Sequence, residues 1–297
     1  GKVSTSLANS GLDVDANSSV TSLTVGHTTP VSIDTGITLS GAITVTGGSI
    51  RLDEAGTLGS TVSMSGGTLD VDKTLTLSGA LSHTADITID VKAGETLTYS
   101  GAAINLGTKT LTLSGGGTFS NTNALVLNDA SSKLLLNSIT VGKVSTSLAN
   151  SGLDVDANSS VTSLTVGHTT PVSIDTGITL SGAITVTAGS IRLDEAGTLG
   201  SSVSMSGGTL DVDKTLTLSG ALTQTADITI DVATGMTLTY SGAAIGVGAN
   251  TITLSGGGSL VSGGLTLNDA ESKLLLNSIT VDSVSTSANS SGLDVDA

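Results

Sequence analysis

The residues best suited to chemistry are four equally spaced aspartates, namely Asp15, Asp34, Asp53 and Asp72. If the segments that carry them stack in register, neighbouring carboxylates lie about 5 Å apart and repel each other by roughly 3 kcal/mol at an effective dielectric constant near 20. Such a column must splay into solvent, take up protons or bind cations. Calcium would suit it, because this ion accepts several carboxylate and carbonyl oxygens. The alternative is a solvated turn aspartate that bonds only the local backbone.

A second outward column is formed by Thr38, Thr57 and Thr76 at the same interval. Threonine ladders on a flat solenoid face resemble those of ice-binding β-helices. A partner column would need a threonine one interval before Thr74, and Ala55 stands there. One column does not make a two-column face, and threonine on the exposed side of a strand is ordinary β propensity. The sequence therefore argues against ice binding.

Residues for catalysis are scarce in this chain. Lys and Arg total 10, and Tyr99, Tyr240 and Phe119 are the only aromatic residues. Enzymes that cleave polysaccharides generally rely on paired carboxylates. His27 and His168 are one position in two copies of a repeat, so the three histidines do not match metal-ligand spacing. We expect no enzyme, no catalytic, metal or cofactor-binding residue, and no cofactor apart from the calcium alternative.

The aspartates belong to a recurring pattern of apolar, polar, apolar and acidic residues. It occurs at 12–15, 31–34, 50–53, 69–72 and 87–90, and its spacing is constant except that the last interval is shorter by one position. The pattern indicates a short strand with two side chains on one face, followed by a turn residue. One short strand in each period of about 19 residues predicts a solenoid whose coils stack on one another.

When residues about 19 positions apart are aligned, the apolar residues fall into three columns, and Gly-rich corners separate these columns. The columns are Leu12, Val31, Ile50 and Leu69 (with Val14, Ile33, Leu52 and Val71 beside them); Val20, Leu39, Leu58 and Leu77; and Ile43, Val62 and Leu81. We therefore predict an all-β parallel β-helix with about 19 residues and three short strands per coil. The column of Val45 and Met64 next reaches His83. Because burying it would be costly, we expect a local register shift that turns His83 outward.

The sequence pattern does not define the coil boundaries within 87–152. The next matches to the pattern begin at Leu111, Leu125 and Leu153, at unequal gaps. The alternative fold is a string of immunoglobulin-like sandwiches, which also give alternating strands with frequent turns. Sandwiches do not require equally spaced columns, and they usually have a core aromatic residue. The columns favour the solenoid.

A longer repeat overlies the coils, and position 1 returns at position 142. We predict a first solenoid copy at 1–141, a second at 142–281 and the start of a third at 282–297, all in one continuous solenoid. From Gly1 to Leu81 the first copy differs from the second only at Gly47 against Ala188 and at Thr61 against Ser202. The parent array is expected to be longer than this chain.

The amino-acid composition and net charge limit the classes of partner that the chain can bind. The chain has 297 residues, 39 Gly, no Cys and a net charge of −15. The acidic balance argues against nucleic acid, and no apolar run approaches the roughly 18 residues of a membrane helix. We expect neighbouring copies of the chain as partners, end to end or side by side, no nucleic acid, no membrane insertion, and a carbohydrate or cell-surface ligand as a further option.

The segments 74–79 (TLTLSG) and 108–118 (TKTLTLSGGGT) resemble the repeats of autotransporter passengers and filamentous-haemagglutinin-type adhesins. The resemblance implies a right-handed parallel β-helix that is extracellular or displayed on a bacterial cell surface. We expect a structural segment of a long extracellular rod or filament built from near-identical repeats. The alternative is the stalk or ligand-binding repeat of a bacterial surface adhesin.

Overall fold

The structure is a computed structural model that describes residues 2–5, 19–26, 31–33, 38–39, 41–52, 55–146, 152–155, 159–167, 171–174, 183–193, 196–289 and 291–296. Within these residues every regular element is a β-strand. No helix in them is long and apolar enough to cross a membrane. The chain divides into a first unit (Gly1–Val144 with Asn158–Ser160) and a second unit (Ser145–Ala157 with Val161–Ala297).

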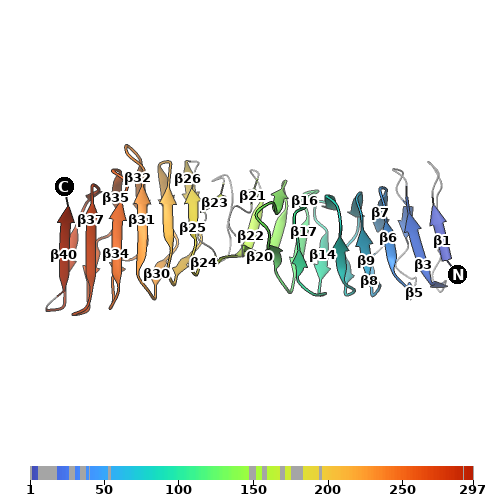
Figure 1. The fold of residues 1–297 in the computed structure, drawn as a ribbon, viewed down its shortest axis with the longest axis horizontal. Helices are drawn as coiled ribbons and strands as arrows, with labels where there is room; N and C mark the ends of the chain where they lie inside the picture. The colour runs from blue at the N-terminus through green and yellow to red at the C-terminus, as the bar shows by residue number, and fades with distance from the viewer. Residues whose placement is uncertain are drawn as a thin grey trace. The chain divides into compact units, whose positions relative to one another are not determined.

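In the first unit the strands of successive coils lie side by side in parallel sheets (Figure 1). One sheet contains β1 (Lys2–Thr5), β3 (Ser22–Val25), β6 (Ile43–Val45), β9 (Val62–Met64) and β12 (Leu81–His83). A second contains β4 (Val31–Ile33), β7 (Ser49–Leu52), β10 (Thr68–Val71), β13 (Ile87–Val91), β16 (Thr110–Ser114) and β19 (Lys133–Leu136). A third contains β8 (Gly56–Leu58), β11 (Leu75–Leu77), β14 (Thr96–Tyr99), β17 (Thr118–Asn121) and β20 (Thr140–Thr146). Shorter pairs join β2 (Ser19–Val20) to β5 (Thr38–Leu39), and β15 (Ile104–Asn105) to β18 (Leu125–Leu127).

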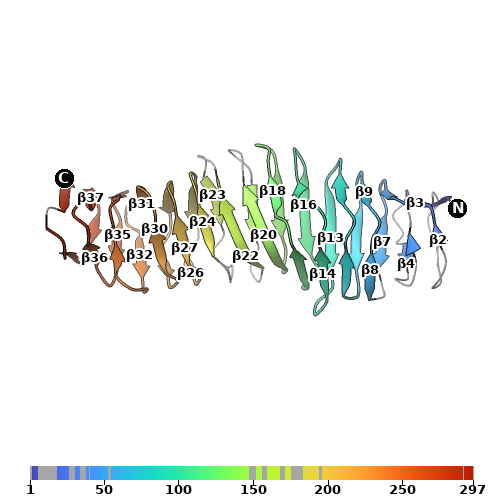
Figure 2. The same ribbon diagram turned by 90° about the horizontal axis from the view of Figure 1, so that it is seen from below.

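The second unit repeats this arrangement, and Figure 2 shows the stacked strands from below. One sheet contains β23 (Pro171–Ile174), β25 (Ser190–Leu193), β28 (Thr209–Val212), β31 (Ile228–Val232), β34 (Thr251–Ser255), β37 (Lys273–Asn277) and β40 (Gly292–Asp296). A second contains β26 (Gly197–Leu199), β29 (Leu216–Leu218), β32 (Thr237–Tyr240), β35 (Ser259–Val261) and β38 (Thr280–Val281). The remaining strands are β21 (Gly152–Val155), β22 (Ser160–Val166), β24 (Ile184–Val186), β27 (Val203–Met205), β30 (Leu222–Gln224), β33 (Ile245–Gly246), β36 (Leu265–Leu267) and β39 (Val284–Thr286).

The fold is a parallel β-solenoid with about 20 residues per turn, and the predicted fold class is confirmed. Each coil contributes three short strands, as β10, β11 and β12 illustrate, and each strand joins a different sheet. Parallel neighbours exchange backbone hydrogen bonds along the stack, so every coil is tied to the coils before and after it.

The interior consists of columns of aliphatic side chains. Ile50 pairs with Leu69, and Leu52 pairs with Val71; each of these four side chains is at most 1% exposed. The predicted columns through Val31 and through Ile43 are confirmed by the strand register. The predicted members Leu12 and Val14 lie outside the described residues.

The prediction is wrong about the coil that follows Leu69. The sequence pattern aligned Leu69 with Ile87, whereas the structure pairs Leu69 with Ile89 and Asp70 with Asp90. This coil is therefore longer than the coil before it, not shorter. The added length lies in the turn between β12 and β13. The pattern at Leu125 belongs to β18, in another sheet, and β19 with Leu134 continues the column of Leu111.

The expected outward shift of His83 is also wrong. His83 pairs in register with Met64 and stays on the inward side of β12, where it is partly buried. Its Nδ1 lies 3.2 Å from the carbonyl oxygen of Ala85, while its Nε2 is buried without a hydrogen-bond partner in the described structure. Register is kept because the flanking Leu81 remains buried against Val62.

One corner shows why glycine is needed between strands. Gly66 and Gly67 have φ of 137° and 85°, values that favour glycine over other residues. A Cβ on Gly67 would overlap the carbonyl oxygen of Gly48 in the preceding coil. The coils can therefore approach closely here only without a side chain.

Candidate functional site

The predicted aspartate column can be followed only at its last member. Asp15, Asp34 and Asp53 lie outside the described residues. Asp72 takes part in ion pairs with Arg51, at 3.4 Å, and with Lys92, at 3.8 Å. Among the described residues no group of three or more His, Cys, Asp or Glu side chains could hold a metal ion.

The outward face of the sheet that contains β7, β10, β13 and β16 carries a charged ladder that the repeating pattern did not predict. Arg51 on β7 bonds Asp70 on β10 at 3.0 Å, and the Ser114 hydroxyl on β16 donates to Asp90 on β13 at 2.5 Å. Asp70 and Asp90 are themselves paired in register. The signal was present in the sequence, because Arg51 and Asp70 are 19 residues apart.

The second unit repeats the ladder with less positive charge. Arg192 lies 3.1 Å from Asp211 and 3.2 Å from Asp213, and position 233, the counterpart of Lys92, is alanine. Desolvation raises the pKa of Asp211 above its usual value; the hydrogen bond from Arg192 opposes this rise, and the negative charge of Asp213 adds to it. The carboxylates of this ladder are therefore less fully compensated than those of the first unit.

The threonine column has a partner that a constant interval did not reveal. Thr57 pairs with Thr76, as predicted, and the column continues to Thr98. A second column runs beside it, because the Thr74 hydroxyl accepts a hydrogen bond from the amide of Thr96 at 3.2 Å. The second column continues from there through Thr118 and Thr140. The prediction of a single threonine column is therefore wrong at two coils, where Thr74 lies beside Thr76 and Thr96 lies beside Thr98. On β17 the first column continues with Ser120 in place of a threonine. The side chain of Thr38 lies outside the described side chains.

Not every hydroxyl on this face is available to a ligand. Thr74 donates both its amide, at 2.7 Å, and its hydroxyl, at 2.8 Å, to Oε2 of Glu95. These hydrogen bonds lower the pKa of Glu95 below its usual value of 4.5. In the second unit Met236 stands in the place of Glu95, and Val261, at 44% exposure, interrupts the threonine column.

All three Tyr and Phe side chains of the chain are buried in the core. Tyr99, Phe119 and Tyr240 are 1%, 0% and 4% exposed. Tyr99 and Phe119 stack with ring centroids 6.3 Å apart. None of them offers an outward face on which a sugar ring could stack. His27 and His168, which are one position in two copies of the repeat, lie outside the described residues.

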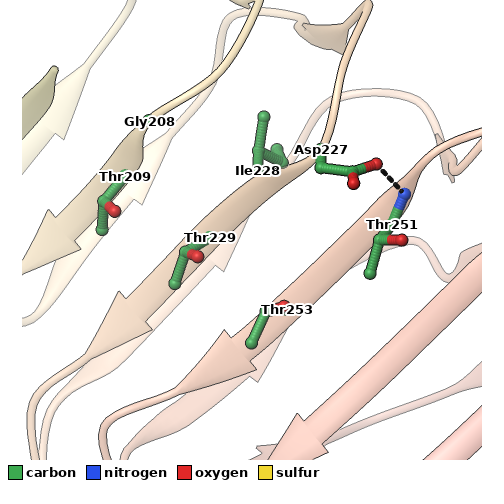
Figure 3. A pocket seen from close by; sticks show the side chains of 7 residues that line it. All are labelled: Gly208, Thr209, Asp227, Ile228, Thr229, Thr251 and Thr253. Carbon is green, nitrogen blue, oxygen red and sulfur yellow. Dashed lines mark hydrogen bonds between the residues drawn. The ribbon is translucent and has the colours of Figure 1, made fainter. Parts of the chain in front are cut away.

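A hollow of about 310 Å³ opens on the outer face of β28, β31 and β34 in the second unit (Figure 3). Its walls carry the hydroxyls of Thr209, Thr229 and Thr253, which form one register column. Asp227 stands at one side, and its Oδ1 accepts a hydrogen bond from the amide of Thr251 at 2.7 Å. The result is a shallow polar site.

A second hollow of about 500 Å³ shares Asp227 and Thr251 with the first. It extends to Glu271 and Lys273. The turn that holds Glu271 is fixed, because the Glu271 amide donates to Asp269 at 2.9 Å and the buried Ser272 hydroxyl donates to the Gly248 carbonyl at 2.6 Å. We call the two hollows together the Asp227 groove.

Comparison of the chain with protein-family models, with curated proteins and with solved structures gave no match. The strand topology alone places the chain in the class of repetitive β-solenoids.

Proposed function

We propose that the chain is a structural segment of a long extracellular rod or filament built from tandem, near-identical β-solenoid repeats. The observation that carries this proposal is that polar side chains bond mainly from coil to coil. Arg51 bonds Asp70, 19 residues away, and Ser114 bonds Asp90, 24 residues away. Such contacts add lateral support to the backbone ladders between coils.

The distribution of side chains supports the same role. Aliphatic columns fill the interior of each unit. Over residues 1–81 and 142–222 the two copies have nearly the same sequence, as expected where the repeats themselves are the function. Uniform spacing also suits a scaffold, because each coil contacts mainly its neighbours.

Electron microscopy of the native material tests this proposal. About seven coils of about 4.8 Å each give an axial period of roughly 35 Å for each copy of the long repeat. We expect long, uniform fibres with that period. Globular particles without it would contradict a filament role.

A stalk of a bacterial surface adhesin is the second candidate. The resemblance of 74–79 and 108–118 to adhesin repeats favours it, and these segments provide β11 and β16. In that case the same microscopy would show rods of fixed length that end in a distinct head.

A further inference from the structure

The Asp227 groove of the second unit presents hydrogen-bonding groups that the protein itself does not use. Within the described residues, no partner is found for the hydroxyls of Thr209, Thr229 and Thr253, or for Oδ2 of Asp227. The three hydroxyls repeat at the coil spacing of about 4.8 Å. A ligand with several hydroxyl groups along its length could meet them in sequence.

The charges of the groove favour a ligand that also carries positive charge. Asp227 and Glu271 contribute two carboxylates, against the single ammonium of Lys273. Glu271 lines the groove from a turn in which its backbone amide is fixed by the hydrogen bond to Asp269. The net charge of −15 on the whole chain adds long-range attraction for a cation.

The first unit has the same hydroxyls with a different charge. Asp86 accepts a hydrogen bond from the amide of Thr110 at 2.8 Å, as Asp227 does from Thr251. However, Ser131 stands in the place of Glu271. The equivalent surface of the first unit therefore lacks one carboxylate.

We propose that the Asp227 groove binds a saccharide segment that carries amino groups, such as a short glucosamine oligomer. The threonine column hydrogen-bonds the sugar hydroxyls. Asp227 and Glu271 pair with ammonium groups, and charge-assisted hydrogen bonds of this kind are stronger than neutral ones. This site is independent of the structural role proposed above, because a rod needs no ligand.

The test uses the full chain at pH 6 and low salt, with a glucosamine trisaccharide as the probe in isothermal titration and ligand-observed NMR. Cellotriose provides the hydroxyls without the charge, and spermidine provides the charge without the hydroxyls. We expect the glucosamine trisaccharide to bind at least about tenfold more tightly than either control probe. Equal binding of spermidine, or no binding of the trisaccharide, would overturn the proposal.

Variants then locate the site. Asp227→Asn keeps an acceptor for the Thr251 amide, so the fold should persist, but we expect affinity to fall about tenfold. Glu271→Ser copies the first unit and should weaken binding about threefold. Asp86→Asn is the matched control, and it should leave the affinity unchanged. A loss from Asp86→Asn as large as that from Asp227→Asn would show that the groove is not the site.

Discussion

The hydroxyl of Tyr99 accepts a hydrogen bond from the amide of Leu81, one coil earlier, at 3.1 Å inside the core. Tyr240 and Leu222 repeat this contact at the same distance in the second unit. Position 101 must stay small beside this contact, since a Cβ on Gly101 would lie 2.5 Å from the Tyr99 oxygen. Each tyrosine thus replaces a backbone acceptor at a point where the coil lengthens.

Tyr99→Phe should destabilise the first unit, because it leaves the buried Leu81 amide without an acceptor. We expect a loss of about 1–3 kcal/mol in local stability. Native-state hydrogen exchange at the Leu81 amide measures it, with the Leu222 amide as the internal control. Equal loss of protection at both amides would argue against a local effect, and Tyr240→Phe should reverse the pattern.

His83→Gln should stabilise the first unit. At the equivalent position, Gln224 donates through Nε2 to the carbonyls of Gly246, at 2.5 Å, and Val247, at 3.0 Å. The buried Nε2 of His83 has no such partner in the described structure. A glutamine there can reach the corresponding carbonyls of the next coil, and we expect a gain of about 1 kcal/mol.

Urea unfolding of the full chain measures this change, and Gln224→His is the reciprocal variant. We expect it to destabilise by a similar amount. A gain from both substitutions, or a loss from both, would contradict the explanation, since it depends on one side chain having partners and the other lacking one.

Gly67→Ala should cost far more than Gly94→Ala. Both glycines have positive φ, at 85° and 81°, so both substitutions carry the same backbone strain of about 1 kcal/mol. Only Gly67 faces the backbone of the preceding coil, and nothing lies within 4 Å of a Cβ on Gly94. We expect Gly67→Ala to lower the thermal midpoint of the first unit clearly more. Equal midpoints would mean that the coils can separate without cost.

The protection of the Thr74 amide should depend on acid pH. Its acceptor, Glu95, has a lowered pKa in the folded chain, first because of the hydrogen bond from the Thr74 side chain. The folded state therefore binds this proton less readily than the unfolded state. The contribution is present above the usual value of 4.5 and is lost as the pH falls through the lower folded value.

Hydrogen exchange compared at Thr74 and Thr215 tests this dependence. The Thr215 hydroxyl meets the sulfur of Met236 at 4.0 Å in place of a carboxylate, so the protection of this residue should not titrate in this range. We expect the ratio of the two protection factors to fall on acidification, and Glu95→Met to abolish the change. A ratio that stays constant in the wild-type chain would disprove the role of Glu95.

The sequence predicted the solenoid well wherever coil length is constant. Ile50 and Leu69 could be paired in advance because inward apolar residues recur at a fixed interval. Beyond Asp72 the coils become longer, and the repeating pattern then assigns the wrong partners, as it did for Ile87. The extra residues enter turns, which leave little trace in an alternating pattern.

The candidate site could be predicted only in part, for the same reason. The second threonine column requires Thr74 to align with Thr96, an interval of 22 residues. The Asp227 groove depends on the lengthened coil between β31 and β34, where Thr251 and Asp227 are 24 residues apart. The predicted outward turn of His83 was wrong because Leu81, on the same strand, packs in register with Val62 and holds His83 in register with Met64.

The winding of the chain has a mechanical consequence. A coil of about 20 residues occupies about 4.8 Å of each stack, yet the same residues reach roughly 65 Å when pulled straight. Peeling a single coil would therefore lengthen the chain more than tenfold at that point while the remaining coils stay intact. A tether built in this way yields gradually under load, because it holds a reserve of length in every turn.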